Sequence, residues 1–146
     1  MRTHSISSSS NTASSAGVHE GHVSVLSQES LEALAIQPDD VVIDATLGGA
    51  GHARMIAAQL GSAGMLIGFD LDPAAIARAK TALKGVLPQV ALRQANFRTM
   101  RTLSEDGIRP TKILFDLGWS SYHLSSGRGF SFRANEPLLM TYGPVE

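Results

Sequence analysis

Three aspartates, Asp44, Asp70 and Asp116, each follow a short run of apolar residues and precede a loop. If the apolar runs are parallel strands of one sheet, their carboxyl ends meet at the same edge, where open α/β sheets bind ligands. Capping of the following helix is the alternative role for any one of these carboxylates. Three carboxylates that converge on one edge favour a ligand-binding site there.

The loop that follows Asp44 is rich in glycine and leads into a predicted helix. It reads ATLGGAGH over residues 45–52. Glycine lets the backbone approach a ligand closely, and the helix N-terminus offers free N–H donors. Asp70 lies 19 residues after Gly51, at the position from which an acidic side chain accepts hydrogen bonds from the ribose hydroxyls of an adenosine. The loop and Asp70 together predict a cofactor that contains adenosine.

The charges around the loop indicate which adenosine cofactor it is. The dinucleotide fingerprint G-x-G-x-x-G is not present, because the run GGAG at residues 48–51 lacks the third glycine at the required spacing. Asp44 would repel a pyrophosphate, but its charge suits the ammonium and sulfonium groups of S-adenosylmethionine. We therefore expect a methyl donor as the cofactor, with a nicotinamide-dependent oxidoreductase as a distant alternative.

The loop after the fourth apolar run combines an acid, hydroxyl groups and an aromatic ring. It reads DLGWSSYHL over residues 116–124. Such a loop beside a cofactor resembles the place where amino-group methyltransferases hold a flat base, with Ser120 and Ser121 as further hydrogen-bonding groups. A place for Trp119 in the ordinary core is the alternative.

Each of these residues must be positioned by an element that the sequence predicts. Apolar, β-branched runs predict strands, and apolar residues at helical spacing between capping signals predict helices. Strands are expected over residues 41–45, 65–70, 90–92 and 112–116. Helices are expected over residues 27–35, from 51 to about 60, from 73 onward and over 97–105. Ser27 is the expected cap of the first helix and Asp72 that of the third. Strands that alternate with helices in this way predict a doubly wound α/β fold with a parallel sheet.

The composition fits one globular α/β domain, since the 146 residues are 43% hydrophobic with a formal net charge of −1. The absence of cysteine excludes disulfides and thiolate chemistry, and His19 and His22 have no third ligand at metal spacing, so no metal site is predicted. No apolar run reaches the roughly 20 residues of a membrane helix, so we expect a cytoplasmic protein without a membrane partner. Residues 1–20, rich in serine, are expected to form a disordered tail, and residues 21–146 the domain.

The near-neutral total conceals an uneven distribution of charge. Residues 1–73 hold two basic and eight acidic residues, whereas residues 74–112 hold eight basic and two acidic ones. Solvated helix faces are the plainer interpretation of the basic side chains, and a phosphate-facing patch is the alternative. The side chains concerned are Arg78, Lys80, Lys84, Arg93, Arg98 and Arg101.

These motifs make the chain resemble the RsmH (MraW) family of S-adenosylmethionine-dependent methyltransferases, which modify the N(4) amino group of a cytidine in 16S ribosomal RNA of the small ribosomal subunit. The resemblance runs from about His22 to Tyr142. Its motifs are HVSVL at 22–26, DATLGGAGH at 44–52, FDLDP at 69–73, NF at 96–97, DLGWSS at 116–121, RGFSF at 128–132 and PLLM at 137–140. It implies the Rossmann-like fold of class I methyltransferases, S-adenosylmethionine as cofactor and 16S ribosomal RNA as partner.

The resemblance also implies which residues bind the cofactor. These are Ala50, Gly51 and His52 at the methionine end, Asp70 at the ribose, Phe97 near the adenine, and Asp116 and His123 completing the pocket. Asp116 is in addition the candidate catalytic residue, as the group that orients the amine. The chain departs from the family pattern at His123, where Gln is usual, at Leu139, where Asp is usual, and in a loop after Leu124 that is one residue shorter.

Members of this family have a seven-stranded sheet and an inserted helical substrate domain, whereas four strands are predicted in this chain. A sheet truncated after its fourth strand exposes an edge and apolar surface, so we expect marginal stability or self-association. The alternative to an active enzyme is a residual module that binds the cofactor or RNA without turnover.

Overall fold

A four-stranded parallel sheet forms the centre of the computed structural model, which describes residues 26–119 and 121–143. The strands are β1 (Val41–Asp44), β2 (Met65–Asp70), β3 (Gln89–Gln94) and β4 (Lys112–Leu114). Their order is β3-β2-β1-β4, and all neighbours pair in parallel. The order reverses at β1, because β2 and β4 lie on its two sides. The carboxyl end of β1 is therefore the place where sheets of this kind bind ligands.

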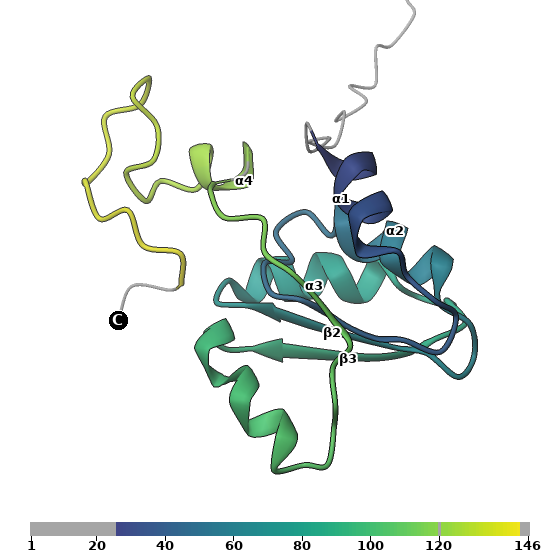
Figure 1. Ribbon diagram of the computed structural model, residues 1–146. Coiled ribbons are helices and arrows are strands. Elements are labelled where there is room, and N and C mark those ends of the chain that lie inside the picture. Colours follow the sequence, from purple (N-terminus) through teal and green to yellow (C-terminus); the bar gives the residue numbers. More distant parts are fainter. Residues whose placement is uncertain (1–25, 120, 144–146) are drawn as a thin grey trace, which may run out of the picture.

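Helices cover both faces of this sheet (Figure 1). They are α1 (Ser27–Leu34), α2 (Gly51–Gln59), α3 (Pro73–Ala82), the 3₁₀ helix η1 (Phe97–Ser104) and α4 (Ser121–Leu124). The first three pack on one face and η1 packs on the other. Side chains alternate along β1 accordingly, with Val42 in the core under α1 to α3 and Ile43 in the core under η1. The predicted doubly wound α/β fold is confirmed.

The helix boundaries follow the prediction with one exception at α1. α2 begins at Gly51 and α3 at Pro73, and the carboxylate of Asp72 caps α3 by accepting from the N–H of Ala74 at 3.0 Å. α1 begins at Ser27 itself, with Leu26 in the cap position, so the prediction of Ser27 as the N-cap is wrong. The local pattern located the helix, but the chain enters it one residue earlier than a serine cap requires.

Strand ends differ from the prediction because strand pairing decides them. β1 and β4 end before residues 45 and 116, since the last pair between them is Asp44 with Leu114. β3 is longer than the predicted 90–92, because it pairs with β2 along the whole of that strand.

The helix predicted over residues 97–105 forms as a 3₁₀ helix. Asn96 caps it, with its side-chain oxygen accepting from the N–H of Arg98 at 3.0 Å. Three hydroxyl groups each donate to the carbonyl three residues earlier. They belong to Thr99, Thr102 and Ser104. These bonds match the spacing of the tighter 3₁₀ helix.

β4 is held beside β1 by contacts made just before the two strands. The buried Asp40 accepts hydrogen bonds from the N–H of Gln37 at 2.7 Å and from the hydroxyl of Thr111 at 2.7 Å. These bonds, the one from Gln37 foremost, hold the pKa of Asp40 below its ordinary value. The N–H of Thr111 also donates to the carbonyl of Val41 at 2.8 Å. These contacts therefore fix where β4 begins relative to β1.

Gly68 on β2 leaves room for Leu47 of the glycine-rich loop. A Cβ at Gly68 would lie 2.6 Å from Cδ2 of Leu47, and both residues are buried. We expect Gly68→Ala to lower the free energy of unfolding by about 1–3 kcal/mol through overpacking, measured by chemical denaturation. Gly51→Ala is the control, because nothing lies within 4 Å of a Cβ at that position. An unchanged midpoint for Gly68→Ala would show that Leu47 moves aside at no cost.

The chain after β4 runs past the carboxyl ends of the strands. α4 and residues 125–143 lie beyond that edge of the sheet and cover neither face (Figure 1). Arg128 ties this segment to the start of α3 through an ion pair with Asp72 at 3.2 Å. The segment is thereby attached to the end of the sheet that carries the three aspartates.

Some predictions concern residues 1–25, which lie outside the described ranges. They include the serine-rich tail over residues 1–20 and the two histidines His19 and His22. Within residues 26–119 and 121–143, no helix is long and apolar enough to cross a membrane.

Candidate functional site

The three aspartates that were predicted to converge do so at the carboxyl edge of the sheet. Asp44 ends β1, Asp70 ends β2, and Asp116 follows β4 by two residues. β1 lies between β2 and β4, and the charges of Asp70 and Asp116 both act on Asp44. The sheet order therefore places negative charge on both sides of the glycine-rich loop.

Asp44 differs from the other two because it is buried, with 1% of its surface exposed. Its Oδ1 accepts from the N–H of Thr46 at 3.1 Å, while Oδ2 has no hydrogen-bond partner among the described residues. Burial raises the pKa of Asp44 to about 7; the N–H of Thr46 opposes this shift, and the charges of Asp70 and Asp116 add to it. A buried carboxyl group with one unsatisfied oxygen is suited to a cationic ligand.

Asp70 anchors the glycine-rich loop and still has acceptor capacity for a ligand. Its Oδ2 accepts from the N–H of Gly48 and its Oδ1 from the N–H of Asp72, both at 2.8 Å. Gly48 has φ 48°, a left-handed conformation that glycine adopts without strain. Each carboxylate oxygen has a second lone pair. The side chain can therefore accept two more hydrogen bonds, as a ribose diol would donate.

The predicted loop residues Ala50, Gly51 and His52 form the N-terminus of α2. Ala50 is the N-cap residue, is fully buried, and has φ 63°. This left-handed conformation costs a residue with a Cβ about 1–2 kcal/mol. The first N–H groups of α2 have no partners within the helix and point out of its N-terminus. The loop thus holds a strained conformation at a place where backbone donors are free for a ligand.

His52 and Asp116 lie together between the start of α2 and the end of β4. His52 Nδ1 is 3.4 Å from Asp116 Oδ2, with the imidazole buried and the carboxylate about half exposed. Nε2 of His52 is buried and has no hydrogen-bond partner in the described part of the chain. Asp116 is therefore the member of the pair that a substrate can reach from solvent.

Thr46 is a residue of this site that the sequence interpretation missed. Its N–H donates to Asp44, and its hydroxyl accepts from the N–H of Asp116 at 2.9 Å. An aspartate side chain commonly accepts a hydrogen bond from the backbone N–H two residues later in the chain. That pattern could have indicated the contact with Asp44, whereas the contact with Asp116 depends on the strand order.

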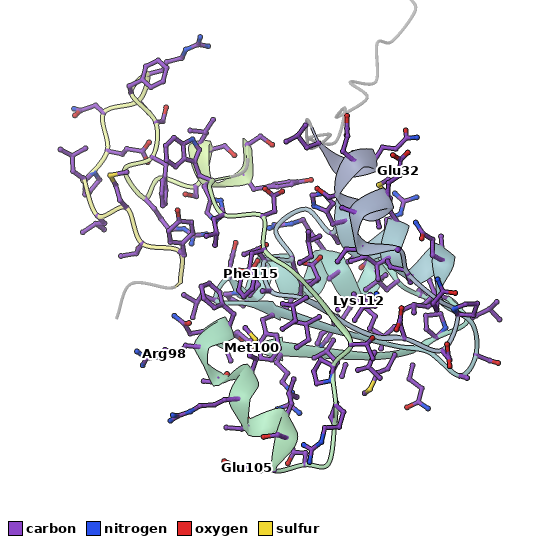
Figure 2. The ribbon with its side chains drawn as sticks, in the orientation of Figure 1. Glu32, Arg98, Met100, Glu105, Lys112 and Phe115 are labelled. Atoms are coloured by element: carbon purple, nitrogen blue, oxygen red, sulfur yellow. The ribbon has the colours of Figure 1, made fainter. Side chains whose placement is uncertain are left out.

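Phe97 stands at the start of η1, directly after β3. Its ring packs edge to face on that of Phe115, with 5.3 Å between the centroids. Figure 2 labels Phe115 just beyond β4, on the side where η1 carries Met100. The ring of Phe115 is about half exposed. The pair therefore offers an apolar wall at the η1 side of the site.

His123 lies in α4 and is buried among aromatic rings. Its ring centroid is 5.3 Å from that of Phe130 and 5.1 Å from that of Tyr142. Burial lowers the pKa of His123, and Arg128 lowers it further, against the opposing charges of Asp70 and Asp72. Its surroundings therefore favour the neutral form of the imidazole.

The residues expected on the substrate side are mostly exposed. Trp119 is 58% exposed, so it does not belong to the core formed by the described residues. Ser121 begins α4, and Leu139 is about half exposed. Ser120 lies outside the described residues.

For Arg78 the plainer of the two interpretations, a solvated helix face, is wrong, because its guanidinium group binds the glycine-rich loop. The group donates to the carbonyl of Gly48 through Nε at 3.3 Å and a terminal nitrogen at 3.2 Å. The sequence carries no local sign of this contact, because the two residues are 30 positions apart.

Comparison with known proteins places these observations in a family. Residues 19–144 match the MraW methylase family. Relatives are ribosomal RNA small subunit methyltransferase H from Thiobacillus denitrificans, 50% identical over 126 residues, and from Heliobacterium mobile, 41% identical over 127 residues. Each alignment covers 84% of this chain, but 40% and 41% of the relatives. The chain therefore spans about two fifths of the length of the curated relatives it matches.

Solved structures share the fold. A protein described as an rRNA-methylase from Clostridium thermocellum matches with a TM-score of 0.56 at 25% identity, over 65% of this chain and 52% of that one. NSun6 from Pyrococcus horikoshii, solved with SFG, matches with a TM-score of 0.53 at 23% identity, over 87% and 29%, which concerns the fold alone. With a Rossmann-like parallel sheet and a family match over residues 19–144, this chain belongs to the MraW methylase family.

Proposed function

We propose that this chain is the cofactor-binding part of an S-adenosylmethionine-dependent methyltransferase, which acts in the cytoplasm on the N(4) amino group of a cytidine in 16S ribosomal RNA of the small subunit. Family membership supports the reaction, and the relatives named ribosomal RNA small subunit methyltransferase H support the substrate. The observation that carries the cofactor proposal is the convergence of Asp44, Asp70 and Asp116 around a glycine-rich loop where the strand order reverses.

The charge of the site favours a cationic adenosine cofactor over a dinucleotide. Asp70 has acceptor capacity for a ribose diol, while Asp44 and Asp116 offer negative charge to an ammonium or sulfonium group. A pyrophosphate would be repelled by the same carboxylates. The other members of the proposed cofactor-binding set are Ala50, Gly51, His52, Phe97 and His123.

When bound, S-adenosylmethionine supplies an electrophilic methyl group on a positively charged sulfur. The amino nitrogen of cytosine shares its lone pair with the ring, so the amine must be held in line and must lose a proton. Asp116 is the proposed catalytic residue, because its half-exposed carboxylate can accept a hydrogen bond from that amine. His52 at 3.4 Å and the hydroxyl of Thr46 at 2.9 Å restrain Asp116.

Part of the basic segment supports attraction of the RNA backbone. Arg98 and Arg101 are exposed on η1, and Figure 2 shows Arg98 pointing away from the sheet. Arg93 is paired with Asp106 at 3.2 Å, so it offers less charge to a phosphate. We assign the phosphate-facing role to the arginines of η1 and leave Lys80 and Lys84, which are exposed, as solvated residues.

The alternative is a module that binds the cofactor or RNA without turnover. The described residues supply the candidate cofactor site, and the chain spans 40% of the length of the Thiobacillus denitrificans relative.

Titration calorimetry with S-adenosylmethionine, combined with methyl transfer to immature small subunits, tests both proposals. Binding with transfer supports the methyltransferase, and binding without transfer supports the module. Preference for NAD in the same titration, or no binding of either compound, would contradict the proposed cofactor.

We also expect this chain to self-associate through β4. Among the described residues β4 pairs with β1 alone, and Ile113 on β4 and Phe115 directly after it are 43% and 46% exposed. An open strand edge with apolar neighbours pairs readily with another strand. Sedimentation velocity should show an average sedimentation coefficient that rises with concentration.

Ile113→Lys should reduce this association, because an edge lysine opposes strand pairing. Met55→Lys is the matched control, since Met55 is exposed on α2, which packs on a face of the sheet and not at a strand edge. A monomer at every concentration, with a sharp thermal transition that does not depend on concentration, would contradict the prediction.

A further inference from the structure

Arg78 on α3 reaches across to the glycine-rich loop and binds the same loop residue, Gly48, as Asp70 does. Its Nε and one terminal nitrogen both donate to the carbonyl of Gly48, at 3.3 and 3.2 Å. The N–H of the same Gly48 donates to Asp70 at 2.8 Å. Gly48, which has a left-handed conformation, is therefore held through both of its backbone polar groups.

The same guanidinium group of Arg78 also contacts α4. Its central carbon lies 4.1 Å from the centroid of the Tyr122 ring, which is the geometry of a cation–π contact. Tyr122 also covers the loop, since a Cβ at Gly49 would lie 3.3 Å from Cε2 of that ring. Arg78 thus donates to the loop and also places its charged group over the Tyr122 ring of α4.

A second contact ties the same two parts of the chain together. Asp72, the cap of α3, is paired with Arg128 at 3.2 Å and lies 3.7 Å from Arg78. Arg128 in turn donates to the carbonyl of Tyr142 at 2.7 Å. Through Arg78 and Arg128, α3 is therefore linked to both the glycine-rich loop and the C-terminal segment.

We propose that Arg78 is a positioning residue for the cofactor site: together with Gly48 and Tyr122 it forms a clamp that couples the glycine-rich loop to α4. The inference rests on the proposed cofactor-binding function. Lysine cannot replace arginine in this clamp, because the two donors to Gly48 and the stacking face both require the planar guanidinium group. The hydroxyl of Tyr122 is not needed, because the ring face makes the contact.

The test compares Arg78→Lys, Tyr122→Phe and Lys80→Ala in the full 146-residue chain. Lys80 lies on the same helix and is exposed, so its removal controls for the loss of a cation. Calorimetry measures the dissociation constant for S-adenosylmethionine, and hydrogen exchange followed by NMR measures the protection of the Gly48 amide. Thermal unfolding of each variant distinguishes a displaced glycine-rich loop from an unfolded protein.

We expect Arg78→Lys to raise the dissociation constant about tenfold and to speed exchange of the Gly48 amide by a similar factor, with the thermal transition nearly unchanged. Tyr122→Phe and Lys80→Ala should match the wild type in both measurements. Arg78→Lys with wild-type affinity and wild-type exchange would overturn the proposal.

Two further outcomes remain decisive. If Arg78→Lys does not fold, Tyr122→Leu tests the clamp instead, because it removes the aromatic ring that Arg78 contacts. Tyr122→Leu should weaken cofactor binding and speed exchange of the Gly48 amide, whereas Tyr122→Phe should do neither. Wild-type affinity and exchange in Tyr122→Leu would overturn the clamp. If the wild-type chain binds no S-adenosylmethionine, the proposed function fails, whereas the exchange rate of Gly48 still tests the clamp.

Discussion

Replacing Asp70 with alanine is expected to weaken the binding of S-adenosylmethionine about 100-fold. The substitution removes the acceptor proposed for two ribose hydroxyls, and hydrogen bonds to a charged group contribute about 1.5–3 kcal/mol each. It also releases the N–H groups of Gly48 and Asp72, which Asp70 holds at 2.8 Å. The loop then loses its order as well as its acceptor. Titration calorimetry at neutral pH measures the effect.

Two comparisons make the result of Asp70→Ala specific. Asp39→Ala removes an exposed carboxylate from the turn before β1, and it should bind like the wild type. Asp70→Asn keeps one acceptor oxygen and should lie between the wild type and alanine. Unchanged affinity in a folded Asp70→Ala variant would show that the ribose is held elsewhere.

Replacing Asp44 with asparagine is expected to stabilise the protein above pH 7 while weakening cofactor binding. Burial raises the pKa of Asp44 from the ordinary 3.8 to about 7, so the unfolded chain ionises this group at a lower pH than the folded protein. The free energy of unfolding therefore falls as the pH rises from about 4 to about 7, by at most about 4 kcal/mol. Asparagine does not ionise and avoids this loss.

Urea denaturation at pH 5 and pH 8 measures the effect as a difference between Asp44→Asn and the wild type. The variant should gain stability relative to the wild type on going from pH 5 to pH 8, whereas Asp39→Asn should follow the wild type at both. Calorimetry should show weaker binding by Asp44→Asn, because the buried group can no longer carry the charge that a cationic ligand attracts. A constant difference at both pH values would mean that Asp44 titrates at its ordinary pKa.

The element order and most of the predicted site could be obtained from local patterns. The apolar run before Asp70 and the signal of Asp72 followed by Pro73 each lie within a few residues, and local backbone preferences act over that range. β2 and α3 begin where they were predicted for this reason. The alternation of strands and helices also indicated that the strand-ending aspartates would share one edge, as they do.

Tertiary structure decided the contacts between residues far apart in the chain. Gly48 is joined to Asp70 across 22 positions and to Arg78 across 30, and Asp40 is joined to Thr111 across 71. These pairs form because β1 lies between β2 and β4, and because α3 lies close enough to the glycine-rich loop for Arg78 to bind it.

The state of Asp44 was decided in the same way. The sequence by itself determined that a carboxylate stands at the end of β1, next to a glycine-rich loop. Its burial, its raised pKa and its unsatisfied oxygen arise from the strands on both sides and the charges that they carry. Desolvation depends on everything packed around a group in three dimensions, and no local pattern of residues encodes it.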